Sequence, residues 1–295
     1  MTFPARIAIL LSALLMTRLV IPAEAQKRPL DIELVGSDST AFHVVAAIIS
    51  GPTEAIVWDA HYHIGDARRL ADRIAASGKR LKAIVLSHPD HDHYMGTATL
   101  VERFPGTPVY LTPAGLRHYD STAREVFTQE KQRQPALYPD SLVTPKALPS
   151  PEMTIDGVKV EIVSDLVGDI VGPASSALWI PSSRTVLAGD LVFNGVHPWL
   201  GGSNAASRAA WRQALKRIAA LKPARVIAGH KSRLDAPDDL EQLALMDRYL
   251  ADFDSLRARS AGPGPLRDAM LARYPSLAVG MLLQYSAMIA FGPPR

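Results

Sequence analysis

The pattern of apolar and polar positions predicts strands and helices in alternation along most of the chain. Strands are predicted where short apolar segments lie between turn residues, and helices where apolar residues recur every three to four positions. The expected strands are 31–35, 42–49, 55–58, 81–86, 109–111, 158–163, 177–180, 185–188 and 225–228. The expected helices are 66–77, 96–104, 114–134, 211–222 with a cap at Ser203 or Asn204, 238–259, 266–273 and 277–289. Several strands in a row before the alternation indicate a layered α/β fold with mixed sheets.

Glycine and proline turn residues are spread evenly along the chain, which has no fixed-period repeat and no low-complexity tract. Five prolines between positions 135 and 151 mark one irregular connection in the middle. We therefore predict a catalytic domain at 26–235 and a helical C-terminal extension at 236–295 that packs on it. The last apolar segment, 279–291, is too short to span a membrane and predicts a packed helix.

The first 25 residues have the features of an export signal. Arg6 supplies a charged start, 7–16 is apolar, and 23–25 (Ala-Glu-Ala) fits a cleavage site. An uncleaved membrane anchor is the alternative, but Arg18 interrupts the apolar segment well before the roughly 20 residues needed to cross a bilayer. We expect cleavage after residue 25, export to the periplasm or the medium, and no stable membrane span in the mature protein.

Charge and cysteine content limit the partners and the chemistry. The 32 basic and 29 acidic residues give a net charge of +3 without any basic run, which argues against nucleic acid as a partner and leaves a small molecule as the expected one. The chain has no cysteine, so disulfides, thiolate metal sites and thiol nucleophiles are excluded. Any metal must be held by histidines and carboxylates.

Three apolar strands run directly into a residue that can bind metal. His88 follows the strand at 81–86, Asp190 follows 185–188, and His230 follows 225–228. Strand ends project side chains from a rigid scaffold into a shared rim, and the glycines before Asp190 and His230 let the backbone turn and approach closely. This recurrence predicts one site built from all three strand ends.

The segment 88–93 holds three histidines and two aspartates, which is unusual for a solvated turn. If the segment starts extended, positions 88 and 90 point the same way. A turn after Pro89 into a helix then brings Asp92 and His93 round to a second position. The segment can therefore supply ligands to two adjacent metals.

This segment resembles the His-x-His-x-Asp-His motif of the metallo-β-lactamase superfamily, followed by the expected glycine, Gly96. Asp190 is similar to the bridging aspartate of that superfamily, and His230 to its last histidine. Asp59 is similar to the aspartate at the end of the strand before the first helix. The similarity extends from about residue 31 to 235 in the same order and spacing.

The resemblance implies a four-layer αββα sandwich with the metals in a cleft at one sheet edge. We expect one or two zinc ions, with manganese or iron as alternatives because carboxylates replace histidines among the ligands. One metal would take His88 and residue 90, and the other Asp92, His93 and His230, with Asp190 between them. It also implies that a hydroxide shared by the metals is the nucleophile, with Asp92 and Asp190 in catalytic roles. Activity would fall at acid pH because the histidines must be neutral to bind.

The chain departs from the motif at two places. If Asp92 and His93 keep the register, Asp90 replaces the second histidine; in a rival register His91 binds and Asp90 does not. The histidine expected some twenty residues before Asp190 is absent. Either Asp169 replaces it or is only a turn residue, and His197 either fills the gap, contacts substrate or is merely packed. These replacements make the centre less positive, since two divalent ions, a hydroxide and the carboxylates of residues 90, 92 and 190 sum to zero.

Aromatic residues near the motifs are candidates for the wall of a substrate pocket: Tyr94, Phe193 and Trp199. His61 and His63 would line the entrance. The expected reaction is hydrolysis of an ester, lactone or thioester. The alternatives are a metal-depleted or weakly catalytic binding protein, a phosphodiesterase, and a β-lactamase, which the Asp190 position disfavours because β-lactamase relatives carry Cys or Ser there.

Overall fold

The computed structural model describes residues 29–292. The export signal expected at 1–25 and its cleavage site lie outside these residues. In the described part of the chain, no helix is both long and apolar enough to cross a membrane.

Two mixed sheets form the centre of the molecule. The first contains, in spatial order, β1 (Asp31–Gly36), β2 (Val45–Ser50), β3 (Glu54–Trp58), β4 (Arg80–Val85), β5 (Val109–Leu111) and β6 (Lys146–Ala147). The second contains β12 (Arg225–Ile227), β10 (Thr185–Leu187), β9 (Ser175–Ile180), β8 (Val158–Leu166) and β7 (Glu152–Ile155). A short parallel pair, β11 (Phe193–Asn194) and β13 (His230–Lys231), lies beyond the second sheet.

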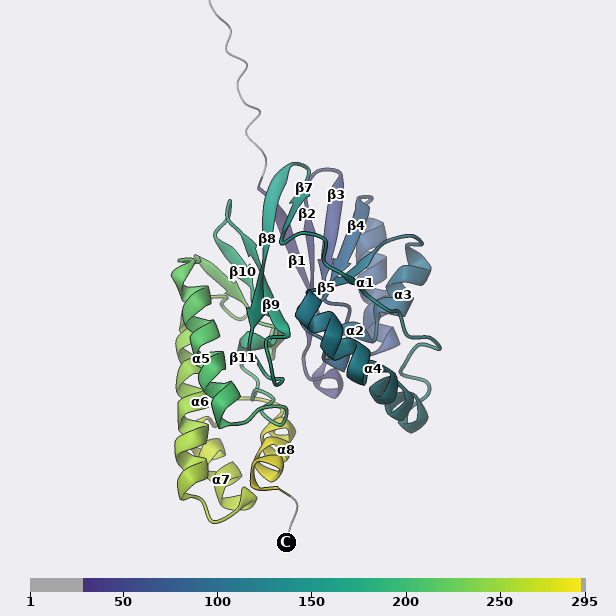
Figure 1. Ribbon diagram of the computed structural model, residues 1–295. Helices are drawn as coiled ribbons and strands as arrows, with labels where there is room; N and C mark the ends of the chain where they lie inside the picture. Colours follow the sequence, from purple (N-terminus) through teal and green to yellow (C-terminus); the bar gives the residue numbers. More distant parts are fainter. Residues whose placement is uncertain (1–28, 293–295) are drawn as a thin grey trace, which may run out of the picture.

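Helices cover the outer face of each sheet (Figure 1). On the first sheet lie α1 (Ile64–Ala76), the single turn α2 (His91–Tyr94), α3 (Thr97–Arg103) and α4 (Pro113–Arg133). On the second lie α5 (Ala205–Ala220) and α6 (Glu241–Arg259), and α7 (Pro263–Arg273) and α8 (Gly280–Phe291) follow at one end. Two short 3-10 turns, η1 (Ser39–Ala41) and η2 (Gly189–Leu191), complete the fold. The expected αββα sandwich is confirmed.

Strand alternation explains why the central strands are apolar on both faces. In β3, Val57 faces the helices of the first sheet, whereas Ile56 and Trp58 face the second sheet. In β10, Val186 faces α5 and α6, whereas Leu187 faces the first sheet. Each inner strand therefore buries one set of side chains between the sheets and another under a helix.

The C-terminal helices share the core of the second sheet. Tyr249 and Phe253 of α6, Met270 of α7 and Leu283 of α8 belong to the same buried cluster as Trp211 of α5. This common core fixes α8 against the body of the protein.

The expected strand at 42–49 is wrong at its start. Ser39–Ala41 form η1, whose cap Asp38 accepts a hydrogen bond from the Thr40 amide at 2.8 Å. Phe42 and His43 follow with positive φ of 57° and 58°, which no strand contains. The strand therefore begins only at Val45.

Candidate metal centre

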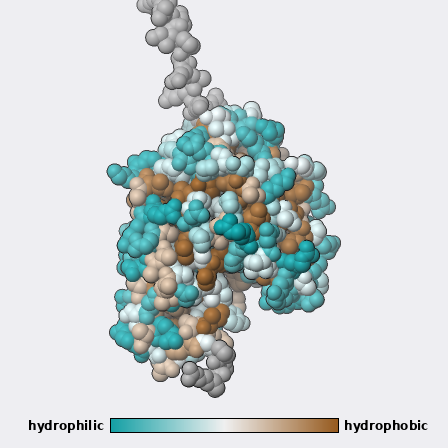
Figure 2. Space-filling view, viewed as in Figure 1, coloured by the Kyte–Doolittle hydropathy of each residue, from teal (hydrophilic) through white to brown (hydrophobic). Residues whose placement is uncertain are grey.

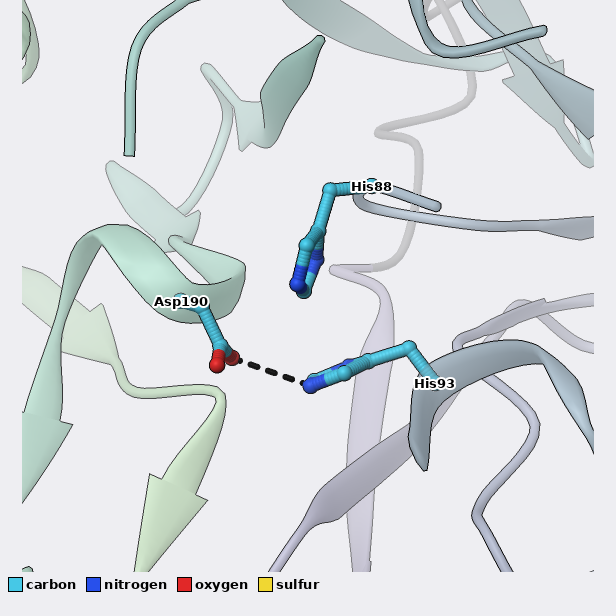
Figure 3. A group of neighbouring side chains, drawn as sticks. All are labelled: His88, His93 and Asp190. Atoms are coloured by element: carbon cyan, nitrogen blue, oxygen red, sulfur yellow. Dashed lines mark ion pairs between the residues drawn. The ribbon is translucent and has the colours of Figure 1, made fainter. Parts of the chain in front are cut away.

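Three strand ends bring the expected ligands together. His88 follows β4, Asp190 lies in η2 directly after β10, and His230 opens β13 after β12. Figure 3 shows the rings of His88 and His93 directed toward the Asp190 carboxylate. All these side chains are buried, so the sequence positions at strand ends become one enclosed cluster.

Among the described residues, four groups of three side chains have ligand atoms that lie within 4.8 Å of one another. Asp92, His93 and His230 form one set, and His88, Asp90 and Asp169 form a second set that shares no residue with it. A third group joins His88, His93 and Asp190, and the fourth joins Asp90, His91 and Asp92. Asp190 lies between the first two sets: its Oδ1 is 3.0 Å from His93 Nε2 and its Oδ2 is 2.9 Å from His230 Nε2. This arrangement fits two adjacent metal ions with Asp190 between them.

Each histidine of the centre uses its Nδ1 for a contact with the protein. His93 Nδ1 donates to Asp59 at 3.0 Å, and His230 Nδ1 donates to the Phe42 carbonyl at 2.7 Å. His88 Nδ1 lies 2.8 Å from the Ser87 hydroxyl. These contacts orient the rings so that Nε2 faces the centre.

Asp59 connects two of the ligand-bearing segments. Its Oδ1 accepts from the Ser87 amide at 2.7 Å, while its Oδ2 holds the ring of His93. Asp59 itself has a positive φ of 64°. The short buried carboxylate thus fixes both the start of the motif and the orientation of one ligand.

Close backbone approach explains two glycines of the site. A Cβ on Gly96 would lie 2.0 Å from the Ala60 carbonyl oxygen, and one on Gly229 would lie 2.3 Å from the Asp190 carboxylate. Real Cβ atoms do not come so near, so neither position can carry a side chain without moving the site.

Buried polar atoms test whether the site suits metal. His88 Nε2, both carboxylate oxygens of Asp169 and Asp190 Oδ1 have no hydrogen-bond partner among the described residues. Buried polar atoms rarely stay unsatisfied, because each costs about 1–3 kcal/mol. Nitrogen and oxygen atoms that face one another in this way are the donor set that divalent transition metals prefer, so the residues fit the metal ions.

The electrostatics of the cluster lead to the same interpretation. Burial lowers the pKa of His88, but the charge and close contact of Asp169 together with the charge of Asp190 outweigh it and raise the pKa to about 9. Against the same effect of burial, Asp190 raises the pKa of His93 and of His230. Burial raises the pKa of Asp169 to about 6. The centre is therefore a buried anionic cluster that attracts protons, and divalent ions must displace those protons to bind.

The two candidates for the missing ligand lie in different places. Asp169 is fully buried and its Oδ1 lies 3.6 Å from His88 Nε2. His197 is equally buried but lies in the core behind β11, where its Nδ1 is 2.9 Å from the Tyr249 hydroxyl. The structure thus groups Asp169 with His88 and Asp90 and packs His197 against α6.

Asp90 and His91 are also separated by the structure. Asp90 caps α2 and accepts from the His91 amide at 2.7 Å, and it shares a ligand set with His88. The ring of His91 lies against the Asp90 carboxylate, with 2.5 Å between Nδ1 and Oδ1, and contacts the edge of Tyr62. His91 forms a candidate group with Asp90 and Asp92 but belongs to no group that contains His88. Asp90 does share a group with His88, so the geometry favours the register in which Asp90 binds.

An open cleft of about 540 Å³ lies over the centre. Its floor contains Asp90, His91, Asp92, Asp190 and His230. Phe193 and Trp199 line its wall, and Phe193 stacks on the ring of His230 with 4.7 Å between the ring centroids. The cleft gives a substrate access to the metal ligands.

The expectation for Tyr94 is wrong. Its side chain is 1% exposed and packs edge-on against Tyr119 in the core under α4, because position 94 of the α2 turn faces away from the cleft. His61 and His63 do not line the entrance either. His61 is fully buried, and His63 stacks on Tyr62 at 4.5 Å.

Other cleft residues have no recognisable signal in the sequence. They come from the polar face of α4 and from α8: Val126, Gln129, Glu130, Arg133, Met281, Leu282 and Tyr285. The sequence of α8 predicts a packed helix, because its apolar residues fit a core pattern as well as they fit a pocket. Nothing in the pattern of α4 separates its cleft-facing polar residues from its solvent-facing ones.

The family follows from a match over most of this fold. The family model for the metallo-beta-lactamase superfamily matches residues 39–230, which contain every proposed metal ligand. The chain belongs to the metallo-beta-lactamase superfamily. Members of this superfamily are typically metal-dependent hydrolases, and the His and Asp groups described above are positioned to hold metal.

Solved structures of the superfamily share the fold at low sequence identity. A metallo-beta-lactamase family protein from Thermus thermophilus is 18% identical with a TM-score of 0.60, covering 86% of this chain and 92% of its own. The metallo-beta-lactamase DIM-1 is 17% identical with a TM-score of 0.54, covering 77% and 98%. The metallo-beta-lactamase from Pontibacter korlensis is 17% identical with a TM-score of 0.52, covering 75% and 94%. No curated protein matches the sequence.

Proposed function

We propose that this protein is an exported metal-dependent hydrolase of uncharged esters, lactones or thioesters. The observation that carries the proposal is the pair of ligand sets around Asp190 at the floor of an open cleft. A binding protein would not need two adjacent sets of metal-ligating side chains beneath a solvent-accessible cavity, nor the unsatisfied buried atoms of His88, Asp169 and Asp190. The export signal expected at 1–25 supports the exported location.

The ligands of the centre would hold two metal ions. His88, Asp90 and Asp169 would hold one ion, and Asp92, His93 and His230 the other, with Asp190 between the two sets. When bound, such ions polarise an acyl oxygen and lower the pKa of water. The aromatic wall formed by Phe193 and Trp199 partly excludes solvent and presents the acyl group to this floor.

The two ligand sets differ in their preference for metals. The set with His88 has two carboxylates and one histidine, whereas the set with His93 has two histidines and one carboxylate. Carboxylate-rich sets suit manganese and iron better than imidazole-rich ones do, so we propose zinc at the second set and tolerance of Mn²⁺ or Fe²⁺ at the first. The centre contains four carboxylates: Asp90, Asp92, Asp169 and Asp190. When all four are ionised, their charges and that of a hydroxide exceed the charges of two divalent ions, and the centre has a net charge of −1.

This negative balance disfavours anionic substrates. Arg133 is the one Lys or Arg among the described cleft-lining residues, and it pairs with Glu130. A phosphodiester or a β-lactam with its carboxylate would meet no free cation beyond the metals. An uncharged acyl compound fits the cleft better, so the charges favour ester hydrolysis over β-lactamase and phosphodiesterase activities.

Metal analysis paired with a hydrolysis panel tests the proposal. Residues 26–295 are purified, their metal content is measured, and a p-nitrophenyl ester, a γ-lactone and an acetyl thioester are compared with a phosphodiester and a β-lactam. We expect two metals per chain and a loss of at least roughly 100-fold in kcat/KM in Asp190→Asn. Asp120→Asn, the same change on an exposed position of α4, is the control.

A folded protein that holds no metal and hydrolyses nothing would identify the binding-protein alternative. Faster turnover of the phosphodiester or the β-lactam than of the acyl compounds would reject the substrate class while keeping the hydrolase. Circular dichroism of both variants separates a lost ligand from a lost fold.

A further inference from the structure

The C-terminal helix α8 forms one side of the cleft. Met281, Leu282 and Tyr285 line it together with Phe193 and Trp199. Apolar patches lie beside and above α8 in Figure 2. The helix α8 lies beyond residues 39–230, which the family model matches.

The apolar surface of α8 continues from the cleft to the outside. Met281, Tyr285, Met288 and Ile289 are 48%, 49%, 45% and 51% exposed. Their spacing of four, three and one residues places them on one side of the helix. Contiguous apolar surface of this kind is costly in water and marks a binding surface more often than isolated apolar residues do.

The wall is held rigidly in place. The Leu200 amide donates to Ser286 Oγ at 2.9 Å, which ties α8 to the loop that carries Trp199. The Ala278 amide donates to the Gly195 carbonyl at 2.8 Å just before the helix begins. At the other end, the guanidinium of Arg257 donates to the Ala290 carbonyl at 3.0 Å. A preorganised wall loses little entropy when a ligand binds to it.

Trp199 joins α8 to the metal centre through close packing. A Cβ on Gly201 would lie 2.4 Å from the indole ring of Trp199 and 2.8 Å from Ile289. Only glycine leaves room for the indole between the loop and α8. The apolar surface is therefore continuous from Phe193, which stacks on His230, through Trp199 to α8.

The charges of the cleft exclude a charged occupant at this wall. The α8 residues that line it carry no charge, and on the opposite wall Glu130 and Arg133 neutralise each other. Glu130 also accepts hydrogen bonds from the hydroxyls of Tyr62 and Tyr138, at 2.9 and 2.8 Å. The charged groups of that wall are thus satisfied by the protein and do not need a ligand.

We infer that α8 binds an apolar chain of the substrate while the acyl carbon lies over Asp190. The inference rests on the proposed function and narrows it to acyl esters or lactones that carry an apolar chain. Met281, Tyr285 and Trp199 then determine chain-length specificity. The continuity of the apolar wall with the ligands of the metal centre favours a substrate chain over a separate partner as the occupant.

A chain-length series tests the inference. The kcat/KM of the purified protein is measured for p-nitrophenyl esters from acetyl to octanoyl. Full burial of a methylene would raise kcat/KM roughly fourfold. Because the cleft is open and buries each methylene only in part, we expect kcat/KM to rise about twofold per methylene. The combined variant Met281→Ser, Tyr285→Ser should lower the octanoyl-to-acetyl ratio at least about tenfold. Met288→Ser, the same change on the same helix but outside the cleft lining, should keep the wild-type ratio.

Binding of methyl alkyl ketones separates the inference from the proposed function. These ketones have the carbonyl and the chain but no leaving group, so calorimetric titration reports binding alone. Tighter binding with longer chains that the combined variant abolishes supports the inference even when no ester is hydrolysed. Ester hydrolysis that does not depend on chain length in the wild type overturns the inference and leaves the hydrolase standing.

The same variants also test two other possible occupants of the α8 surface, a second copy of the chain and a lipid surface. Sedimentation measures self-association, and flotation measures binding to phosphatidylcholine vesicles. A dimer or a vesicle complex that Met288→Ser disrupts, together with an unchanged octanoyl-to-acetyl ratio in the combined variant, assigns the surface to a second copy or a lipid surface and overturns the inference.

Discussion

The orientation of each histidine ring in the centre depends on one contact to its Nδ1 atom. The Asp59 carboxylate, the Phe42 carbonyl and the Ser87 hydroxyl contact the Nδ1 atoms of the three histidines. Of these, only Asp59 could be selected from the sequence, because it stands at the end of a strand in a recognisable position. A carbonyl has no residue-type signature, and a serine beside a histidine is too common to single out.

Asp169 should be required for the ion at the first ligand set. Asp169→Ala removes one of three donors from the set with His88 and Asp90 but leaves Asp92, His93 and His230 intact. We expect the metal content to fall from two ions per chain to one, measured by elemental analysis after dialysis. His197→Ala is the comparison, because His197 contacts Tyr249 and not the centre. Loss of a metal in His197→Ala but not in Asp169→Ala would reverse the assignment.

His197 should make the protein sensitive to acid. Burial lowers the pKa of His197 from 6.5 to about 4, so the unfolded state takes up the proton first as the pH falls. The stabilising contribution is complete above pH 6.5 and is lost as the pH falls through about 4. The difference corresponds to roughly 3 kcal/mol of the free energy of unfolding.

Urea unfolding of wild type and His197→Gln between pH 7 and pH 4 measures this contribution. Glutamine keeps a polar group near the Tyr249 hydroxyl but does not titrate. The variant should lose less stability on acidification than the wild type. Parallel losses in the two proteins would show that His197 is not the group responsible, and that other buried histidines such as His61, with a pKa lowered by burial to about 3, carry the effect.

Among the secondary-structure elements, α5 shows how a local sequence fixes a helix start. Asn204 caps the helix by accepting from the Ser207 amide at 2.9 Å, and the Ser207 hydroxyl accepts in return from the Asn204 amide at 2.8 Å. Asn204→Ala should lower the free energy of unfolding by about 1 kcal/mol, and Asn204→Gly by only a few tenths of that. Equal losses in both variants, measured by urea unfolding, would argue against the cap.

The elements that the sequence predicted are those with a strong apolar pattern. The strand at 109–111 matches β5 in both bounds, and the polar helix at 114–134 differs from α4 by one residue at each end. The two-residue strands β6, β11 and β13 were missed because no period can be recognised in so short a segment. The start of β2 was misplaced because the left-handed residues Phe42 and His43 carry no glycine or asparagine signal.

The same reasoning separates the predictable and unpredictable parts of the site. Ligands at strand ends, such as His88 and His230, could be found because an apolar strand precedes each of them. Asp169 lies in a loop after β8, where an aspartate is equally typical of a turn, and only its position beside His88 distinguishes the two roles. The direction in which Tyr94 points depends on the α2 turn, which the sequence did not fix.

For the molecule as a whole, the centre joins the two halves of the sandwich. His88, Asp90, Asp92 and His93 follow β4 of the first sheet, whereas Asp169, Asp190 and His230 follow β8, β10 and β12 of the second. The described contacts at this junction include the Val45 amide, which donates to the Gly229 carbonyl at 2.8 Å. Metal ions held between these groups would act as cross-links between the sheets.

Removing the metal should therefore lower the stability of the whole molecule as well as its activity. A ligand that binds only the folded state stabilises it by about 2.7 kcal/mol when its free concentration is 100 times its dissociation constant. For a protein of this size each kcal/mol shifts the Tm by about 2–4 °C, so a chelator should lower the Tm by roughly 5–10 °C. Scanning calorimetry with and without chelator measures the shift, and added Zn²⁺ should restore the original Tm.

The control is Asp190→Asn, whose side chain lies between the two ligand sets and which should show a smaller shift in Tm than the wild type. An equal shift in both proteins would mean that the chelator acts elsewhere, and that the sheets are held together by their apolar interface alone.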